Sequence, residues 1–158
     1  MRRKDREIAS MEEIKNIIAS AFVCNIAMCR NNTPYLVPMN FGFDGQYFYL
    51  HSTPEGLKMD ILKENHRVCI AITQDLKITP SANVCKTSME YNSVIVFGRV
   101  EFLSDKAEKI GALRCIIKHL YKDMADNEEK RLRFNEEHLD GLAIIRVKPE
   151  KITGKRSV

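Results

Sequence analysis

The stretch PYLVPMNFGFDGQYFYLHSTPEGLKMDILKENHRVCIAI, residues 34–72, decides the fold. It opens with an apolar strand at 35–43, and the turn pair Asp44-Gly45 separates this strand from a second one at 46–51. An Asp-Gly pair between two apolar runs is typical of a β-hairpin. Pro38 has no N–H to donate, so the first strand should lie at a sheet edge or contain a bulge.

The second half of the stretch predicts a helix and a further strand. Ser52 to Glu55 matches the Ser-x-x-Glu capping box, and Pro54 fits the first helical turn. The helix should run to about Asn65, and its inward residues should be Leu57, Ile61 and Leu62. The apolar run at 68–73 then predicts a strand.

Outward from this stretch, the periodicity predicts the remaining elements. An amphipathic helix is expected at 5–20 and a strand at 22–30, closed by the turn signal Asn-Asn-Thr-Pro. The other segments, in chain order, are a loop at 75–90, a strand at 91–103 with a bulge at Gly98, a helix capped by Asp105 and ending near Tyr121, a charged helix or loop at 123–140, and a strand at 142–155.

Hairpins with interspersed helices favour an α+β fold around a small antiparallel β-barrel over a parallel βαβ sheet. The length of 158 residues, without repeats or a linker, predicts one domain over 1–158.

Composition excludes several classes of protein. The net charge of +4 is a small excess, Trp is absent, and the basic start MRRKDR is interpreted as a solvated end, so no nucleic-acid partner is expected. The apolar runs are too short to span a membrane, and no secretory signal is visible. Five cysteines at irregular spacing indicate reduced thiols, and hence a cytoplasmic protein.

Common catalytic motifs are missing. Cys24 and Cys29, like His66 and Cys69, are an odd number of steps apart and diverge on strands, so no zinc site is expected. The sequence has no Gly-x-Ser-x-Gly elbow, dinucleotide fingerprint or Walker loop.

Two polar clusters remain as candidates. A lysine at a helix start, Lys58, opposes the helix dipole unless an anion is bound there, and Gly56 would let a phosphate approach the free N–H groups. The alternative is that Ser52 only caps and Lys58 lies in solvent. The second cluster, SMEYNSV at 88–94, places Tyr91 and Ser93 on one face, although an ordinary strand start would look the same.

Taken together, the two clusters carry a resemblance. Residues 34–72 followed by YNSVIVFGRVEFL resemble the pyridoxamine-phosphate-oxidase-like split-barrel flavoproteins, and the opening MRRKDREI and closing ITGK resemble their nitroimidazole-resistance (Nim) branch. The resemblance covers nearly the whole chain. It implies a six-stranded antiparallel split β-barrel with flanking helices, a homodimer, and FMN at the dimer interface, with FAD or haem as lesser possibilities.

The resemblance also implies roles for individual residues. The backbone of Pro38, Met39 and Asn40 would line the flavin ring, and His51, Ser52 and Lys58 would hold the ring edge, ribityl chain and phosphate. The contacts that a partner subunit could add would come from Tyr91, Asn92, Ser93 and Val94, with Lys155 as a further candidate. Many relatives have Arg where this chain has Asn92.

Two functions follow from the resemblance. One is an FMN-dependent oxidoreductase that reduces nitroaromatics or another small electron acceptor, with His51 as the catalytic proton donor or as a plain hydrogen-bond partner of the flavin. The alternative is a flavin-binding redox sensor or carrier without turnover. Vitamin B6 oxidation is not expected, because the C-terminal Arg-x-Trp pattern of the true oxidases is missing.

Overall fold

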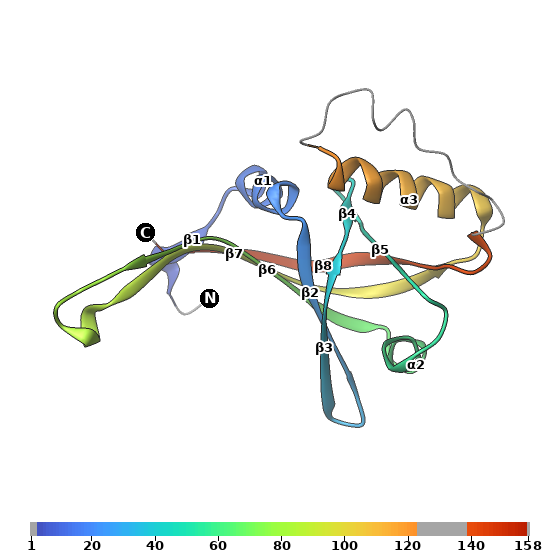
Figure 1. Cartoon of the computed structure of the whole chain (residues 1–158), viewed down its shortest axis with the longest axis horizontal. Coiled ribbons are helices and arrows are strands. Elements are labelled where there is room, and N and C mark those ends of the chain that lie inside the picture. The colour runs from blue at the N-terminus through green and yellow to red at the C-terminus, as the bar shows by residue number, and fades with distance from the viewer. Residues whose placement is uncertain (1–2, 123–138, 158) are drawn as a thin grey trace.

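One antiparallel sheet organises the protein (Figure 1). The computed structural model describes residues 3–122 and 139–157, and in it the strands follow the order β3-β2-β6-β7-β8-β5-β4, with β1 paired to β8. The strands are β1 (Glu7–Ile8), β2 (Val23–Arg30), β3 (Thr33–Asn40), β4 (Gly42–Phe43), β5 (Phe48–Ser52), β6 (Arg67–Thr79), β7 (Ser88–Leu103) and β8 (Ala143–Ser157). The six longer strands form the expected split barrel, in which the end strands β3 and β4 do not pair.

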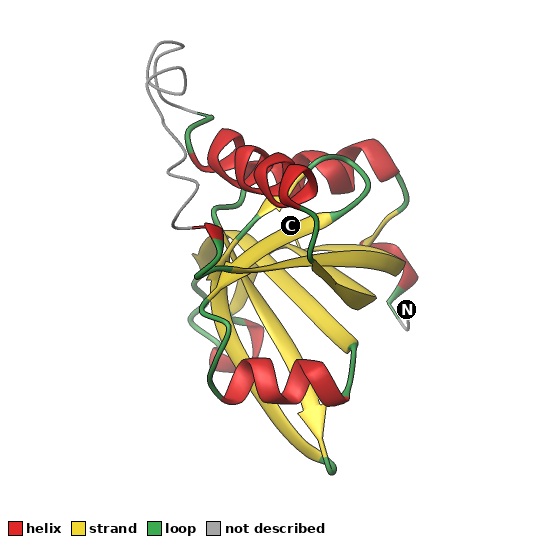
Figure 2. Ribbon diagram, turned by 90° about the vertical axis from the view of Figure 1, so that its right-hand side faces the viewer, coloured by secondary structure: helices red, strands yellow, loops and turns green. Residues whose placement is uncertain are grey.

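Within residues 3–122 and 139–157, three α-helices flank the sheet (Figure 2). The helices α1 (Met11–Ser20) and α2 (Leu57–Glu64) bury Ile14, Ile18 and Leu62 in the main core. The third helix, α3 (Lys106–Leu120), packs on β4 and β5 in a second cluster that contains Leu113 and Ile116. Short 3-10 helices occupy Lys4–Arg6 and Val84–Lys86.

The turns predicted at 31–34 and 44–45 are confirmed, but the single strand expected at 35–43 is wrong. It breaks at Phe41 into β3 and β4, which lie at opposite ends of the sheet. Asn31 and Asn32 adopt φ of 50° and 61°, the left-handed conformation that a two-residue turn between β2 and β3 requires. The Asp44-Gly45 pair joins β4 to β5. As expected, Pro38 lies on an edge strand, since β3 ends the sheet and pairs only with β2.

The bulge at Gly98 is also confirmed. The pairing of β7 with β8 shifts register between Phe97 and Gly98. A Cβ at Gly98 would lie 2.5 Å from the carbonyl oxygen of Lys148, so only glycine allows the two backbones to approach this closely.

The first helix is shorter than predicted. It begins at Met11, where the Ser10 side chain accepts a hydrogen bond from the backbone N–H of Glu13. The residues before it form a 3-10 turn and β1, so Ile8 is buried by strand pairing with β8. Because Ile8 matches a helical spacing by coincidence, periodicity placed the helix start too early.

The capping box at Ser52–Glu55 is wrong. Ser52 is the last residue of β5, and α2 begins after Gly56, which occupies the N-cap position at a φ of 104° and has no side chain to cap the helix. Leu57 is consequently exposed, and Met59 is buried where Leu57 was expected. Ile61 and Leu62 are buried as predicted, so only the inward position of Leu57 is wrong.

The loop predicted at 75–90 is half strand, because β6 continues to Thr79 and β7 begins at Ser88. The ends of β6 and β7 pair as a two-stranded arm that extends at the left of Figure 1. A register shift between Gln74 and Lys77, with Asp75 at a φ of 57°, interrupts the alternation and hides the strand in the sequence. The predicted charged segment at 123–140 lies almost wholly outside the described residues.

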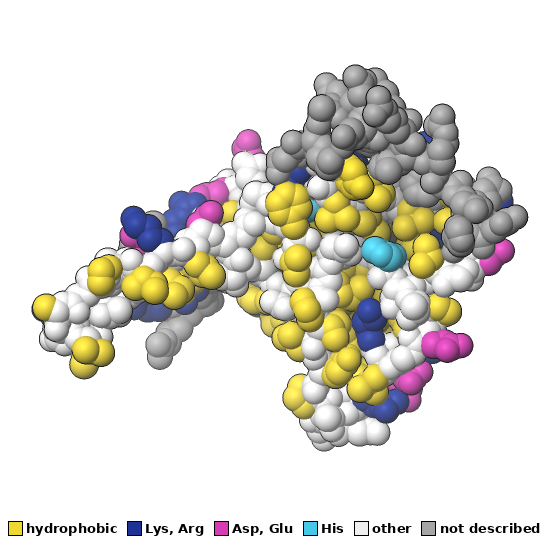
Figure 3. Space-filling model, in the orientation of Figure 1, with side chains coloured by type: hydrophobic (Ala, Val, Ile, Leu, Met, Phe, Trp, Pro, Cys, Tyr) yellow, Lys and Arg dark blue, Asp and Glu magenta, His cyan; other side chains and the backbone are white. Residues whose placement is uncertain are grey.

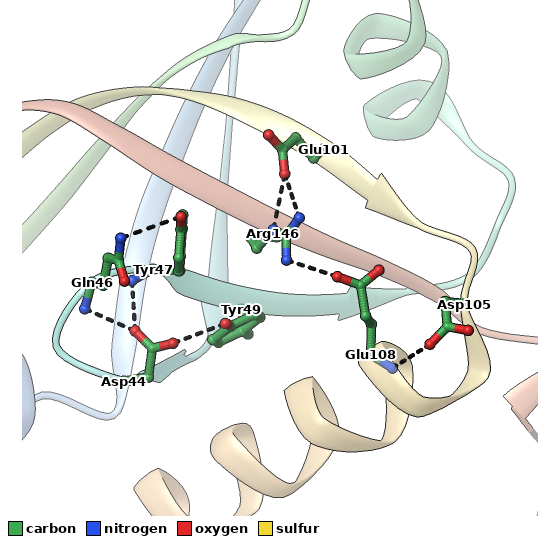
Figure 4. Close-up of polar contacts among 8 residues, drawn as sticks. All are labelled: Asp44, Gln46, Tyr47, Tyr49, Glu101, Asp105, Glu108 and Arg146. Carbon is green, nitrogen blue, oxygen red and sulfur yellow. Dashed lines mark hydrogen bonds and ion pairs between the residues drawn. The ribbon is translucent and has the colours of Figure 1, made fainter.

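A polar turn fixes the start of β5, the strand that carries His51 (Figure 4). Asp44 accepts hydrogen bonds from the backbone N–H of Gln46 (2.8 Å) and Tyr47 (2.6 Å), and the Tyr49 hydroxyl donates to it at 2.8 Å. The hairpin is therefore closed by side-chain as well as backbone hydrogen bonds.

The start of α3 is fixed in the same region (Figure 4). Asp105 caps the helix as predicted, accepting from the backbone N–H of Glu108 at 2.9 Å. Arg146 on β8 donates to Glu101 at 2.9 Å and to Glu108 at 3.1 Å. These contacts tie α3 to the neighbouring strands β7 and β8.

Candidate flavin site

Three predicted residues from separate elements meet beside the start of α2. His51 comes from β5, Lys58 is the second residue of α2, and Met39 comes from the end of β3. The Lys58 ammonium lies 3.6 Å from the Met39 sulfur, which is its only hydrogen-bond partner among the described residues. The face of the molecule drawn in Figure 3 shows histidine and basic side chains set among hydrophobic ones.

The electrostatics of this site favour a ligand that accepts hydrogen bonds. Burial lowers the pKa of Lys58. Burial, followed by the nearby charge of Lys58, lowers the pKa of His51. The Nδ1 atom of His51 is buried and has no hydrogen-bond partner among the described residues. A buried polar atom and a weakly satisfied cation both cost free energy, and an anionic or polar ligand would relieve both costs.

The helix start adds to this site. The first α2 hydrogen bond to Gly56 comes from Asp60 at 3.1 Å, so the N–H groups at 57–59 have no partner within the helix. Gly56 leaves open space, because a Cβ built there would meet nothing within 4 Å. Ser52 is half-exposed at the end of β5. Free N–H groups, a lysine and a hydroxyl are suited to a phosphate.

The end of β3 presents two different faces to its surroundings. Met39 is partly buried and packs against the core, whereas Pro38 and Asn40 are exposed. The backbone of these three residues therefore lies at an open edge of the sheet, next to the side chain that contacts Lys58.

The second predicted cluster lies on β7 and β8. Ser93 pairs directly with Lys155, and the Lys155 ammonium lies 5.3 Å from the centre of the Tyr91 ring. Lys155, and after it Arg6, lower the pKa of Tyr91 through hydrogen bonding and charge. The alternation along β7 places Tyr91 and Ser93 on the face opposite the buried Val94.

Two members of this cluster are already engaged. The Asn92 amide donates to Asp75 at 2.6 Å and accepts from Arg156 at 2.9 Å. Val94 is fully buried in the core and is paired with β6 on one side and β8 on the other, so it offers no group to a ligand.

Within a single chain, the Lys58 cluster and the Tyr91 cluster are not in contact among the described residues. Among the described residues, no hydrogen bond, ion pair or ring contact links His51 or Lys58 to Tyr91 or Lys155. The sequence analysis did not identify Arg6 as a site residue, because it interpreted the basic start of the chain as a solvated end. The pairing of β1 with β8 brings this residue to Tyr91, and a two-residue strand leaves no readable signal in the sequence.

Comparison with known proteins identifies the family. Residues 10–156 match the family described as pyridoxamine 5'-phosphate oxidase. The chain belongs to this family. An uncharacterised protein from Rhizobium meliloti is 28% identical over 96 residues, a match that covers 61% of this chain and 56% of that relative.

Solved structures show the same fold. A candidate 5-nitroimidazole antibiotic resistance protein from Bacteroides thetaiotaomicron is 31% identical, with a TM-score of 0.81 over 95% of this chain and 86% of that one. An FAD- and heme-binding protein from Mycobacterium smegmatis is 17% identical, with a TM-score of 0.84 over 96% of this chain and 73% of that one.

Within residues 3–122 and 139–157, no group of three or more His, Cys, Asp or Glu side chains could hold a metal ion. None of the helices in these ranges is long and apolar enough to cross a membrane. Cys24, the most buried thiol described, has its pKa raised to about 12 by burial.

Proposed function

We propose that the protein is an FMN-binding oxidoreductase that acts as a homodimer and reduces a small acceptor such as a nitroaromatic compound. The observation that carries the proposal is the pair formed by His51 and Lys58. Among the residues that the structure describes, a buried imidazole nitrogen without a partner lies near a half-buried lysine whose only hydrogen-bond partner is a thioether sulfur. The relative from Bacteroides supports the nitroaromatic class, and the protein from M. smegmatis supports a flavin.

The residues present fit the chemical parts of FMN. Lys58 and the N–H groups at 57–59 would bind the phosphate, and Ser52 would bind the ribityl chain. The backbone at Pro38, Met39 and Asn40 would lie along the ring edge. Bound flavin supplies the redox chemistry, and the protein positions it and adjusts its electronics.

His51 is the candidate for a proton-transfer role. Its lowered pKa keeps the imidazole neutral at neutral pH, so Nδ1 can act as a donor or as an acceptor. A phosphate beside Lys58 would offset the charge that helps to lower this pKa. His51 would then be protonated more readily and could give a proton to a reduced acceptor.

The dimer would complete the site. The sheet face opposite the core carries an apolar row across four strands, in which Leu36 pairs with Ala27, Ala27 with Cys69, and Cys69 with Phe97. Leu36 and Phe97 are 56% and 49% exposed. A second copy packed on this face would bury the row and bring the Tyr91 cluster of one subunit toward the Lys58 cluster of the other.

The first experiment is an absorbance spectrum of the purified protein, with mass spectrometry of the material that heat releases. Flavin bands with FMN released support the proposal. Released FAD would support flavin binding but contradict the assignment to FMN. A protein that stays colourless and binds neither added FMN nor added FAD contradicts the flavin proposal, and a Soret band would replace flavin with haem.

A pair of variants tests the role of Lys58. Lys58→Met should weaken FMN binding by roughly 10- to 100-fold, because a charge-assisted hydrogen bond to the phosphate is lost. Lys63→Met on the same helix removes the same charge from an exposed position and should leave the affinity unchanged. Equal affinities of the two variants would refute the phosphate assignment.

Turnover separates an enzyme from a carrier. The flavin is reduced without oxygen, and a panel of nitroaromatic and quinone acceptors is added while flavin absorbance is followed. Rapid reoxidation that slows in His51→Gln supports catalysis with proton transfer. Stable reduced flavin across the whole panel would support a redox sensor or carrier instead.

A further inference from the structure

The arm formed by the ends of β6 and β7 has one polar face and one apolar face. Lys77 pairs with Glu90 across the two strands, and their side chains form an ion pair at 3.5 Å. Ile78 pairs with Met89 at the next position, so these two side chains lie on the other face. Leu76 comes two residues before Ile78 on β6 and shares its face. This division is typical of a sheet that is covered on one side.

The apolar face of the arm is open to solvent. Leu76 and Ile78 are 63% and 64% exposed, and Met89 is exposed as well. Val84, in the short 3-10 helix at the tip, is 84% exposed. The arm projects from the body of the molecule and carries hydrophobic side chains in Figure 3. A two-stranded ribbon alone is marginally stable in water, so we expect another surface to cover this face.

The arm continues the sheet face that carries the apolar row from Leu36 to Phe97. Met89 and Phe97 are an even number of residues apart on β7, so their side chains point the same way. Val94 and Val96 between them point the opposite way and are buried in the core. The arm and the row therefore form one continuous surface on the side of the sheet away from the core.

A second copy of the chain is the occupant that fits this surface. The row offers two large apolar side chains, Leu36 and Phe97. A standard interface buries about 800 Å² on each partner and uses about 20–30 residues a side, so the row alone is too small. Leu76, Ile78 and Met89 extend the same face and supply apolar surface that the row lacks.

The charge of the arm also favours a second copy. Within residues 75–90, the acidic Asp75 and Glu90 balance the basic Lys77 and Lys86. Two neutral arms can approach without repulsion, although each whole chain carries a net charge of +4. Nucleic acids and anionic membranes attract clusters of basic residues, so a neutral arm is poorly suited to either.

We propose that the arm of each subunit packs its apolar face, through Leu76, Ile78 and Met89, on a second copy of the chain. The arm thereby extends the face-to-face contact beyond the row from Leu36 to Phe97. This inference rests on the dimer of the proposed function and adds a contact that the barrel alone does not provide.

Sedimentation equilibrium of the purified protein measures the dimer dissociation constant and tests the arm. Ile78→Asp and Met89→Asp should each raise this constant by roughly tenfold or more, because a charge replaces an apolar side chain that the partner covers. Ser88→Asp is the matched control, since it adds the same charge to the opposite face of the arm and should leave the constant unchanged. All three positions are exposed, and circular dichroism checks that each variant folds.

A cross-link from the arm tip adds a measurement that leaves the apolar face intact. Cys85 is an exposed thiol at the tip. A benzophenone maleimide is attached there and irradiated in a mixture of unlabelled and isotopically heavy chains. Cross-links that join a light peptide to a heavy one, and that disappear in Cys85→Ser, support the proposal. Cross-links confined to one chain, in protein that sediments as a dimer, overturn it.

The sedimentation outcomes also separate this inference from the proposed function. Weakening confined to Ile78→Asp and Met89→Asp supports the arm, even if the purified protein binds no flavin, a result that overturns the flavin proposal alone. A dimer that is unchanged in these two variants and weakened by Phe97→Asp overturns the arm alone. Equal weakening in Ser88→Asp also overturns it, because the effect would then be one of charge.

A chain that stays monomeric at all concentrations overturns both the arm contact and the dimer. Flotation with vesicles of neutral phosphatidylcholine then tests the other occupant of an apolar face. Flotation that is lost in Ile78→Asp would assign the arm to a membrane surface in place of a second copy.

Discussion

Gly42→Ala should destabilise the protein through one contact between β4 and α3. A Cβ built at Gly42 lies 2.6 Å from the backbone nitrogen of Ile116 and 2.7 Å from the carbonyl carbon of Cys115. Neither atom can rotate away, because both belong to the backbone of α3. A retreat of the helix by about 0.8 Å would restore ordinary contact, and it would loosen the packing of Ile116 in the second core cluster.

The expected cost is about 1–3 kcal/mol, the usual range for an extra methyl group in a packed interior. For a chain of 158 residues, each kcal/mol lowers Tm by about 2–4 °C, so a fall of several degrees is expected. Urea denaturation followed by circular dichroism, at one fixed protein concentration, gives the free energy of unfolding.

Gly111→Ala is the matched control on the same helix. A Cβ at Gly111 meets nothing within 4 Å, and the residue lies inside α3. Alanine there should raise the free energy of unfolding by about 0.5–1 kcal/mol, because it lowers the entropy of the unfolded chain. The reasoning would be refuted if the Gly42 variant matched the unchanged protein, or if both variants lost stability equally.

Three further predictions concern capping, pH and assembly. Ser10→Ala should cost about 1 kcal/mol in urea denaturation, because the cap on the Glu13 N–H is lost; an unchanged midpoint would argue against the α1 start. His119, whose Nε2 lies 2.6 Å from the Ala21 carbonyl oxygen, has a pKa lowered from 6.5 mainly by burial. The folded state therefore binds fewer protons than the unfolded state, and stability should fall as pH drops below 6.5, with a shallower fall in His119→Gln; equal slopes would contradict this. Phe97→Asp should convert the proposed dimer to monomers in sedimentation experiments while changing stability by less than about 0.5 kcal/mol, since the side chain is 49% exposed; a persistent dimer would place the interface elsewhere.

Local patterns with a single physical cause were predictable from the sequence. The Asp44-Gly45 turn, the edge position of Pro38 and the bulge at Gly98 each depend on one residue type that the backbone requires. Asp105 was also a correct helix cap, because its carboxylate bonds a backbone N–H three residues on.

Features that depend on pairing over long distances were not predictable. Ile8 fits a helical spacing, yet its pairing with Gly154 draws it into the sheet. The arm formed by β6 and β7 was hidden because the bulge at Asp75 shifts the alternation by one residue.

The candidate site also contains one residue that the sequence indicated and one that it did not. Lys58 at a helix start was visible in the sequence as an electrostatic anomaly, and the structure places it beside His51. Arg6 looked like part of a solvated end, because only tertiary structure brings it to Tyr91.

The edge strand β3 limits how this protein can associate. Residues 34, 36, 38 and 40 alternate with the residues whose backbone faces β2, so their N–H positions point away from the sheet. Two of these four positions are proline, Pro34 and Pro38, and lack the donor. A strand from another molecule would therefore lack two of the four backbone donors it needs to pair here. Growth into fibrils by strand addition is disfavoured at this edge. The proposed dimer packs face to face and does not use this edge, so it would form a closed pair without strand addition at β3.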